Sequence, residues 1–269
     1  MSKYGAILRV SLAERLVYRG NFFISTIFRF LPIITSVFLW SAVFKGSGKT
    51  TIAGYNYADM IGYYMLVMIA RAFSSMPNLS RTIALDIRDG LLNKFLLKPV
   101  DYVAWIFAMR VAHKLVYFLM AGVPFALIIG LLRYHGYFPG WPGLATFAAF
   151  LASLLMGFLI GYFLHVLMGL IAFWMLEVTS FLFLLIMFEH FCSGHMIPLD
   201  LLPDTVRGLC YALPFQYEAY VPVAVFLGRI PSNHVPATLA MQALWVLILF
   251  GLVRCTFTIG LRKYAAVGG

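Results

Sequence analysis

Residues 143–172 read GLATFAAFLASLLMGFLIGYFLHVLMGLIA, a run that contains no Asp, Glu, Lys or Arg. A helix of about 20 apolar residues crosses the hydrocarbon core of a bilayer, which is about 30 Å thick. The run is too long and too uniformly apolar for the alternating strands of a membrane β-barrel. It therefore predicts a membrane-spanning helix.

The flanking sequence repeats this pattern on both sides of the run. Of the 269 residues, 62% are hydrophobic and 11% are charged, whereas about a quarter of the residues are charged in soluble domains. We therefore predict an all-α polytopic membrane protein that forms a single transmembrane domain over residues 1–269. The six predicted transmembrane helices cover residues 22–44, 57–79, 103–131, 143–172, 177–193 and 237–259.

The formal net charge is +10. Most basic residues fall on one side of the predicted spans, and the positive-inside rule assigns that side to the cytosol. Both termini are then cytosolic, and the charge does not call for a nucleic-acid partner. The cytosolic side carries Lys3, Arg9, Arg15, Arg19, Arg71, Arg81, Arg88, Lys94, Lys98, Arg262 and Lys263, and the outer side carries Lys45, Lys49, Arg133, Arg207 and Arg229.

Residues 2–20 predict an amphipathic helix that lies on the membrane surface. Its apolar residues recur at spacings of three and four, and basic residues occupy the other face. The apolar face consists of Tyr4, Ile7, Leu8, Leu12 and Leu16.

Residues 81–101, RTIALDIRDGLLNKFLLKPVD, form a charged island between the second and third predicted spans. An apolar residue recurs every four positions, Gly90 interrupts the middle, and Pro99 ends the helical pattern. We predict two short helices angled about Gly90 at the cytosolic membrane surface. A plain amphipathic surface loop is the alternative. The apolar stripe consists of Ile83, Ile87, Leu91 and Phe95.

Residues 194–236 are rich in proline but still strongly apolar. This combination predicts short helices that dip into the outer leaflet and return, because irregular backbone is tolerated there only where protein or a cavity covers it. An ordinary outer loop with a hydrophobic patch is the alternative. Asp200 and Asp204 are predicted to cap the start of a short helix near Leu201 or Thr205.

No motif in the chain predicts nucleotide binding or catalysis. Residues 46–50 read GSGKT, but Val43 stands where a phosphate-binding loop needs its first glycine. Glu177 and Glu189 belong to one predicted helix, where twelve residues separate them by roughly 18 Å. That distance excludes joint acid–base work on one bond.

Two further groups of residues leave their role open. His190, Cys192 and His195 are close in sequence, and an interfacial polar cluster explains them better than a metal site, because metal sites need well-spaced ligands. Cys192 and Cys210 both fall on the predicted outer side. They form either a disulfide or buried free thiols.

The order of these features resembles the permease subunit of a type-2 ATP-binding-cassette exporter, in the compact bacterial branch with six spans. The resemblance covers essentially the whole chain. It rests on residues 18–22 (YRGNF), 89–101 (DGLLNKFLLKPVD), 173–174 (FW), 197–203 (IPLDLLP) and 213–215 (LPF).

This resemblance implies a non-catalytic permease in the bacterial inner membrane, powered by a separate ATPase subunit. The permease would bind no cofactor, since ATP and Mg belong to the ATPase. It would move an amphipathic or hydrophobic substrate, such as a drug, lipid, peptide or glycan, out of the cytosol or inner leaflet. A second permease protomer, identical or related, and membrane lipid are the other expected partners.

The expected functional residues fall into three groups. The resemblance assigns the ATPase-coupling role to the island and the outer-gate role to the proline-rich segment, and the pathway is predicted from adaptable Met and aromatic side chains. The coupling residues are Asp86, Ile87, Arg88, Asp89, Gly90, Leu91, Leu92, Lys94 and Phe95; the pathway residues are Tyr63, Met65, Met68, Phe183 and Met187; the gate residues are Pro198, Leu201, Leu202, Pro203, Pro214 and Phe215.

Two other functions compete with this one. A membrane-embedded enzyme that modifies lipid would have polar side chains clustered at one depth, and here they are scattered. An ion-coupled secondary transporter would carry ionisable residues near the midplane and paired broken helices. The substrate, and whether the two permeases are identical, stay open.

Overall fold

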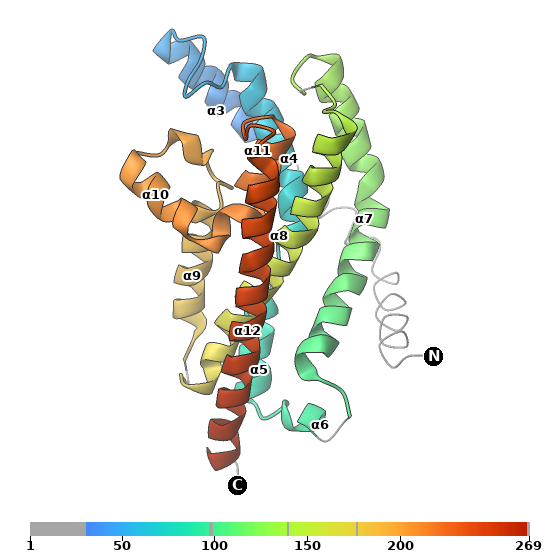
Figure 1. Cartoon of the computed structure of the whole chain (residues 1–269), viewed down its shortest axis with the longest axis vertical. Helices are drawn as coiled ribbons and strands as arrows, with labels where there is room; N and C mark the ends of the chain where they lie inside the picture. The colour runs from blue at the N-terminus through green and yellow to red at the C-terminus, as the bar shows by residue number, and fades with distance from the viewer. Residues whose placement is uncertain (1–30, 97–98, 139, 176, 268–269) are drawn as a thin grey trace. The chain divides into compact units, whose positions relative to one another are not determined.

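The computed structural model describes residues 31–96, 99–138, 140–175 and 177–267 (Figure 1). The described residues fold into helices without a β-strand, apart from an isolated antiparallel bridge between Ile52 and Tyr55. This confirms the predicted all-α class. The predicted surface helix of residues 2–20 lies outside the described residues.

The helices follow one another with short connections. The longer ones are α3 (Leu31–Ser47), α4 (Tyr57–Ser74), α7 (Tyr102–Tyr134), α8 (Leu144–Leu170), α9 (Thr179–Cys192) and α12 (Val235–Val267). The shorter ones are α5 (Leu79–Arg88), α6 (Asn93–Leu96), α10 (Asp204–Ala212), α11 (Tyr220–Phe226) and the 3₁₀ turns η1 (Ile171–Phe173), η2 (Leu199–Leu201) and η3 (Pro214–Glu218).

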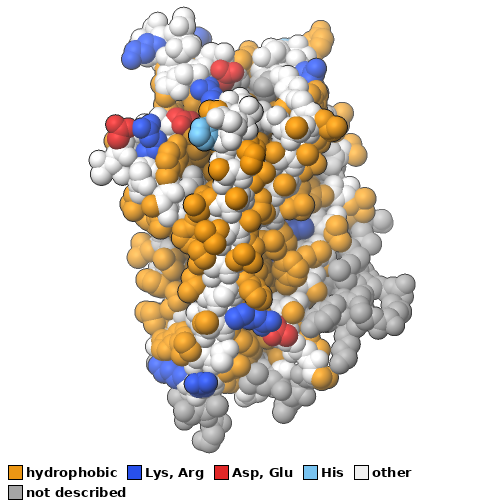
Figure 2. Space-filling model, viewed as in Figure 1, with side chains coloured by type: hydrophobic (Ala, Val, Ile, Leu, Met, Phe, Trp, Pro, Cys, Tyr) orange, Lys and Arg blue, Asp and Glu red, His pale blue; other side chains and the backbone are white. Residues whose placement is uncertain are grey.

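Three described helices are long and apolar enough to cross a membrane, namely α7, α8 with η1, and α12. The described part of α3, together with α9, is apolar but shorter. Figure 2 shows hydrophobic side chains over most of α12, with basic side chains toward its C-terminal end. The chain is therefore a multi-pass membrane protein, and the number of six crossings stays a prediction.

The predicted second span is too long. It was expected to reach residue 79, but α4 ends at Ser74, and a new helix begins at Leu79. Pro77 lacks an amide hydrogen, and Asn78 takes the left-handed conformation with φ 59°. These two residues separate α4 from α5.

The chain forms two compact units. Among the described residues, one contains 31–68, 101–138 and 140–141, and the other contains 69–96, 99–100, 142–175 and 177–267. In the first unit, aromatic side chains join the ends of the helices. The hydroxyl of Tyr57 donates to the carbonyl oxygen of Val37 at 3.1 Å, and the Tyr57 ring meets Tyr137 edge to face.

In the second unit, α8 is the element on which α5, η3, α11 and α12 pack. Glycines in α8 allow neighbouring segments to pack closest to its backbone. A Cβ on Gly157 would lie 2.8 Å from the carbonyl oxygen of Tyr217, and one on Gly161 would lie 2.5 Å from that of Ser74. Gly169 meets α5, where a Cβ would lie 2.7 Å from the Cβ of Ile83.

A buried polar contact fixes α12 against α8. The Ser153 hydroxyl donates to Oε1 of Gln242 at 2.9 Å, and the Gln242 amide donates to the carbonyl oxygen of Ser153 at 2.9 Å. Such a reciprocal pair leaves few unsatisfied groups in a place without water. It sets the rotation of the two apolar helices about their axes.

Candidate functional site

The charged island forms two helices separated by a turn, as predicted. Gly90 has φ +73°, a conformation that costs a residue with a side chain about 1–2 kcal/mol. The amide of Asp89 donates to the carbonyl oxygen of Leu85, and that of Leu92 donates to the carbonyl oxygen of Asp86 at 3.0 Å. These bonds close the end of α5, and α6 follows as a single turn.

One face of the island is buried in the second unit. Ala84 of α5 belongs to a core with Met168 of α8, Val178 just before α9, and Leu182 of α9. Ile83 and Ile87 of the predicted apolar stripe are also buried.

The other face of the island is exposed. Nε of Arg88 lies 3.1 Å from Oδ1 of Asp89, and about half of each side chain is exposed. Leu91 is 37% exposed, and Lys94 is exposed. This face combines both signs of charge with one apolar side chain, which suits a protein partner in water.

The structure corrects one predicted anchor. Leu92 was expected to contact a partner together with Leu91, but Leu92 is fully buried within the chain. The left-handed Gly90 ends the helix, so the residues after it no longer follow the four-residue spacing of α5. Ile87 is likewise buried, whereas Asp86 and Phe95 are half-buried.

The connection between α8 and α9 lies beside the island. Glu177 is exposed there, and its Oε1 accepts from the amide of Thr179 at 2.8 Å. This bond, with a smaller contribution from the charge of Arg88, holds the pKa of Glu177 below its usual value. Glu177 therefore stays ionised on this surface.

The proline-rich segment forms short helices, as predicted, and none of α10, α11, η2 and η3 exceeds nine residues. Of the predicted gate residues, Pro198, Leu202 and Pro214 are buried, Pro203 is exposed, and Leu201 and Phe215 are half-buried. The Phe215 ring meets Phe188 of α9 edge to face at 5.7 Å between centroids.

The predicted caps of this segment are wrong. Helix α10 begins at Asp204 after Pro203, without a side-chain cap, and Asp204 pairs with Arg207. Asp200 instead accepts from the hydroxyl of Tyr220 at 2.7 Å. Burial, the hydrogen bonds to Tyr211 and Asp200, and the nearby carboxylate raise the pKa of Tyr220.

The predicted pathway residues differ in burial. Tyr63 and Met65 are fully buried and Met68 is half-buried on α4. On α9, Phe183 is 61% exposed and Met187 is 46% exposed. Their role as a pathway stays a prediction.

Cys192 and Cys210, the two cysteines on the predicted outer side, are free thiols. Cys192 and Cys210 are both buried, and a hydrogen bond joins their side chains. This contact holds the end of α9 against α10. Cys255 is also free, but exposed.

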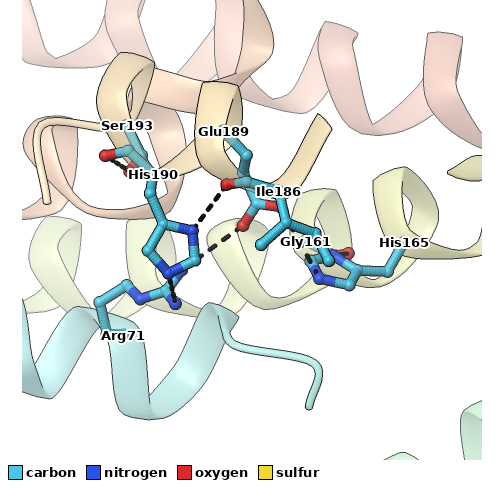
Figure 3. Close-up of polar contacts among 7 residues, drawn as sticks. All are labelled: Arg71, Gly161, His165, Ile186, Glu189, His190 and Ser193. Atoms are coloured by element: carbon cyan, nitrogen blue, oxygen red, sulfur yellow. Dashed lines mark hydrogen bonds and ion pairs between the residues drawn. The ribbon is translucent and has the colours of Figure 1, made fainter. Parts of the chain in front are cut away.

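A buried ionic network lies in the second unit (Figure 3). Nη1 of Arg71, on α4, lies 3.4 Å from Oε1 of Glu189, on α9, and the Glu189 side chain is fully buried. Nη2 of Arg71 lies 2.9 Å from Nε2 of His190. Oε2 of Glu189 lies 3.7 Å from Nε2 of His165, on α8. Three helices thus contribute to one network.

His195 borders this network, with its ring centroid 5.4 Å from that of His190. Burial, and then the charge of Arg71, lower the pKa of His195 to about 3. Within the described residues, no three His, Cys, Asp or Glu side chains are arranged to hold a metal ion. Of the predicted polar cluster, His190 and His195 are in contact, whereas Cys192 contacts Cys210 instead. Arg71, which joins His190, lies far away in sequence.

A comparison with curated proteins returns no match. Residues 30–268 match the family described as ABC-2 family transporter protein. Since this match covers nearly the whole helical, apolar chain, the chain belongs to the ABC-2 transporter family, as a permease subunit.

Proposed function

We propose that this permease exports an amphipathic or hydrophobic substrate, powered by a separate ATP-binding-cassette ATPase that docks on the island of residues 81–101. The family supports an ATPase partner in general. The chain itself has no complete phosphate-binding loop, because Val43 replaces the required glycine. ATP and Mg would therefore bind the partner.

The observation that carries this proposal is the two-faced island. Its buried face packs on α8 and α9, so a push on the exposed face would move these helices. Arg88, Asp89, Leu91 and Lys94 would form the contact. An exposed apolar side chain surrounded by charged ones matches the apolar centre and polar rim of a protein interface.

Replacing Leu91 with Asp is expected to release the ATPase, because a carboxylate would enter an apolar contact. The tagged permease would be purified with its ATPase, and the ratio of the two proteins and the ATPase activity in nanodiscs would be measured. We expect at least a tenfold loss of bound ATPase, which corresponds to about 1.4 kcal/mol. Leu92 is unsuitable for this test, since a buried Asp would damage the fold.

The matched control is Tyr134→Asp. Tyr134 is 86% exposed at the end of α7, outside the island. This variant should keep the ATPase. Equal retention of the ATPase by both variants would show that the island is not the docking surface.

We propose further that two permease protomers, identical or related, form the transporter, since two-fold symmetry is the commonest way to close an assembly. The substrate would pass between them along α4 and α9. The outer ends would close where Leu201 and Phe215 of each protomer form an apolar plug, with the buried Leu202 supporting them from within each protomer. In the resembling family, this segment closes the outer end of the pathway.

A cysteine at Leu201 tests this gate, because Leu201 is only half-buried. In a Cys255→Ser background, a bifunctional thiol reagent should link two permeases and stop export, and a reducible linker should restore export after reduction. Cysteine at Leu244, which is 47% exposed on α12, is the control. Full export by the linked Leu201 variant would exclude the segment as a gate.

A further inference from the structure

The two carboxylate oxygens of Glu189 have different surroundings. Oε1 receives Arg71, whereas Oε2 accepts no hydrogen bond from any residue that the structure describes. The nearest polar atom printed for Oε2 is Nε2 of His165, at 3.7 Å. A buried carboxylate oxygen without a donor is costly where water is excluded. The unsatisfied Oε2 of Glu189 therefore indicates that a donor reaches it in another protonation state of the chain.

The hydrogen bonds of His165 determine its protonation. Nδ1 lies 3.1 Å from the carbonyl oxygen of Gly161, which can only accept, so Nδ1 carries the hydrogen. A neutral imidazole has one N–H, and Nε2 is then a bare acceptor. Two acceptors, Nε2 of His165 and Oε2 of Glu189, face each other with no hydrogen between them.

His190 provides the contrast within the same network. Its Nδ1 donates to the carbonyl oxygen of Ile186 at 2.8 Å, and its Nε2 accepts from Nη2 of Arg71 at 2.9 Å. Both ring nitrogens are satisfied in the neutral form. A further proton on His190 would place an N–H against the guanidinium. The network therefore has room for a proton at His165, and none at His190.

We infer that His165 and Glu189 form a proton-binding site that joins α8 to α9. A proton from hydronium adds to the Nε2 lone pair of His165, an O–H bond of hydronium breaks to leave water, and the resulting imidazolium donates to Oε2 of Glu189. The neutral contact becomes a charge-assisted hydrogen bond, about twice as strong as a neutral one. Ionisable residues inside a membrane domain are generally functional.

The surrounding groups determine how readily His165 binds a proton. Glu189, 3.7 Å from Nε2, favours a proton on His165, whereas the burial of the ring and the nearby guanidinium of Arg71 oppose it. Glu218 of η3 adds a second buried carboxylate, since a Cβ on Gly161, one turn before His165, would lie 3.3 Å from its Oε2. His195 contributes no charge near neutral pH. The site thus sets the carboxylate of Glu189 against the guanidinium of Arg71 and the cost of burying a charge.

The experiment uses the full chain in lipid nanodiscs, with ¹⁵N-labelled histidine side chains followed by NMR during acidification. We expect His165 to change from the Nδ1–H form to the imidazolium. In Glu189→Gln, the amide oxygen still accepts from Arg71 while the amide nitrogen donates to Nε2 of His165. We expect this variant to lower the proton affinity of His165 by about ten- to a thousandfold.

The matched control is His234→Gln, since His234 is exposed in the turn before α12. It should leave the titration of His165 unchanged. Should Glu189→Gln fail to fold, a proton-mediated correlation between Nε2 of His165 and the Glu189 carboxyl carbon in the acidified wild type decides the matter. Equal titration of His165 in wild type and Glu189→Gln, or absence of that correlation, overturns the inference.

Discussion

Replacing Arg71 with Leu is expected to destabilise the folded chain by about 3–5 kcal/mol. The substitution leaves the Glu189 carboxylate fully buried and without its guanidinium, and His190 loses the donor to its Nε2. Removing one partner of a buried pair costs far more than the pair contributes, because the remaining charge has no water. Equilibrium unfolding in mixed detergent micelles, followed by circular dichroism, would measure the loss.

Two further variants test whether the loss of stability comes from this buried ion pair. Arg88→Leu breaks the exposed pair with Asp89 and should change stability by no more than about 1 kcal/mol. The double variant Arg71→Leu, Glu189→Leu should recover part of the loss, since it removes both charges. A double variant as unstable as the single one would contradict the assigned pairing.

Replacing Gly169 with Ala is expected to cost about 1–3 kcal/mol, as overpacking does in a filled core. The new Cβ would lie 2.7 Å from the Cβ of Ile83 and 2.8 Å from the carbonyl oxygen of Ser80. Because backbone atoms cannot give way cheaply, α5 would move off α8. The same unfolding measurement applies, and loss of the docked ATPase should accompany it.

Gly251→Ala is the matched control for this substitution. Gly251 lies in α12, and a Cβ there meets nothing within 4 Å. Since Ala is the better helix former, this variant should gain up to about 1 kcal/mol. If both variants change stability by the same amount, Gly169 is not required for the close packing of α5 on α8.

Much of the fold follows from local patterns. The apolar runs predict the long helices, Gly90 predicts the break in the island, and the prolines predict the short outer helices. Each of these features depends on residues a few positions apart, so the sequence displays it directly. The early end of α4 at Ser74 has a local cause too, in Pro77 and Asn78, and could have been predicted.

The candidate sites depend on contacts that no local pattern displays. Leu91 and Leu92 look equivalent in sequence, yet one is exposed and the other is buried, because the turn at Gly90 rotates them to different sides. Glu189 was considered in the sequence only together with Glu177, whereas its partner Arg71 lies 118 residues earlier. Only the fold of the second unit brings the two side chains together.

The ion pair between Arg71 and Glu189 also has a consequence for biosynthesis. Arg71 leaves the ribosome 118 residues before its carboxylate, and at about 5–20 residues per second the delay is roughly 6–24 s. During that interval, the guanidinium must keep to the headgroups or the insertion machinery, since long basic side chains reach the interface when they lack a partner. The pair therefore forms only after α9 has been made, so Arg71 gains its buried partner late in the synthesis of the chain.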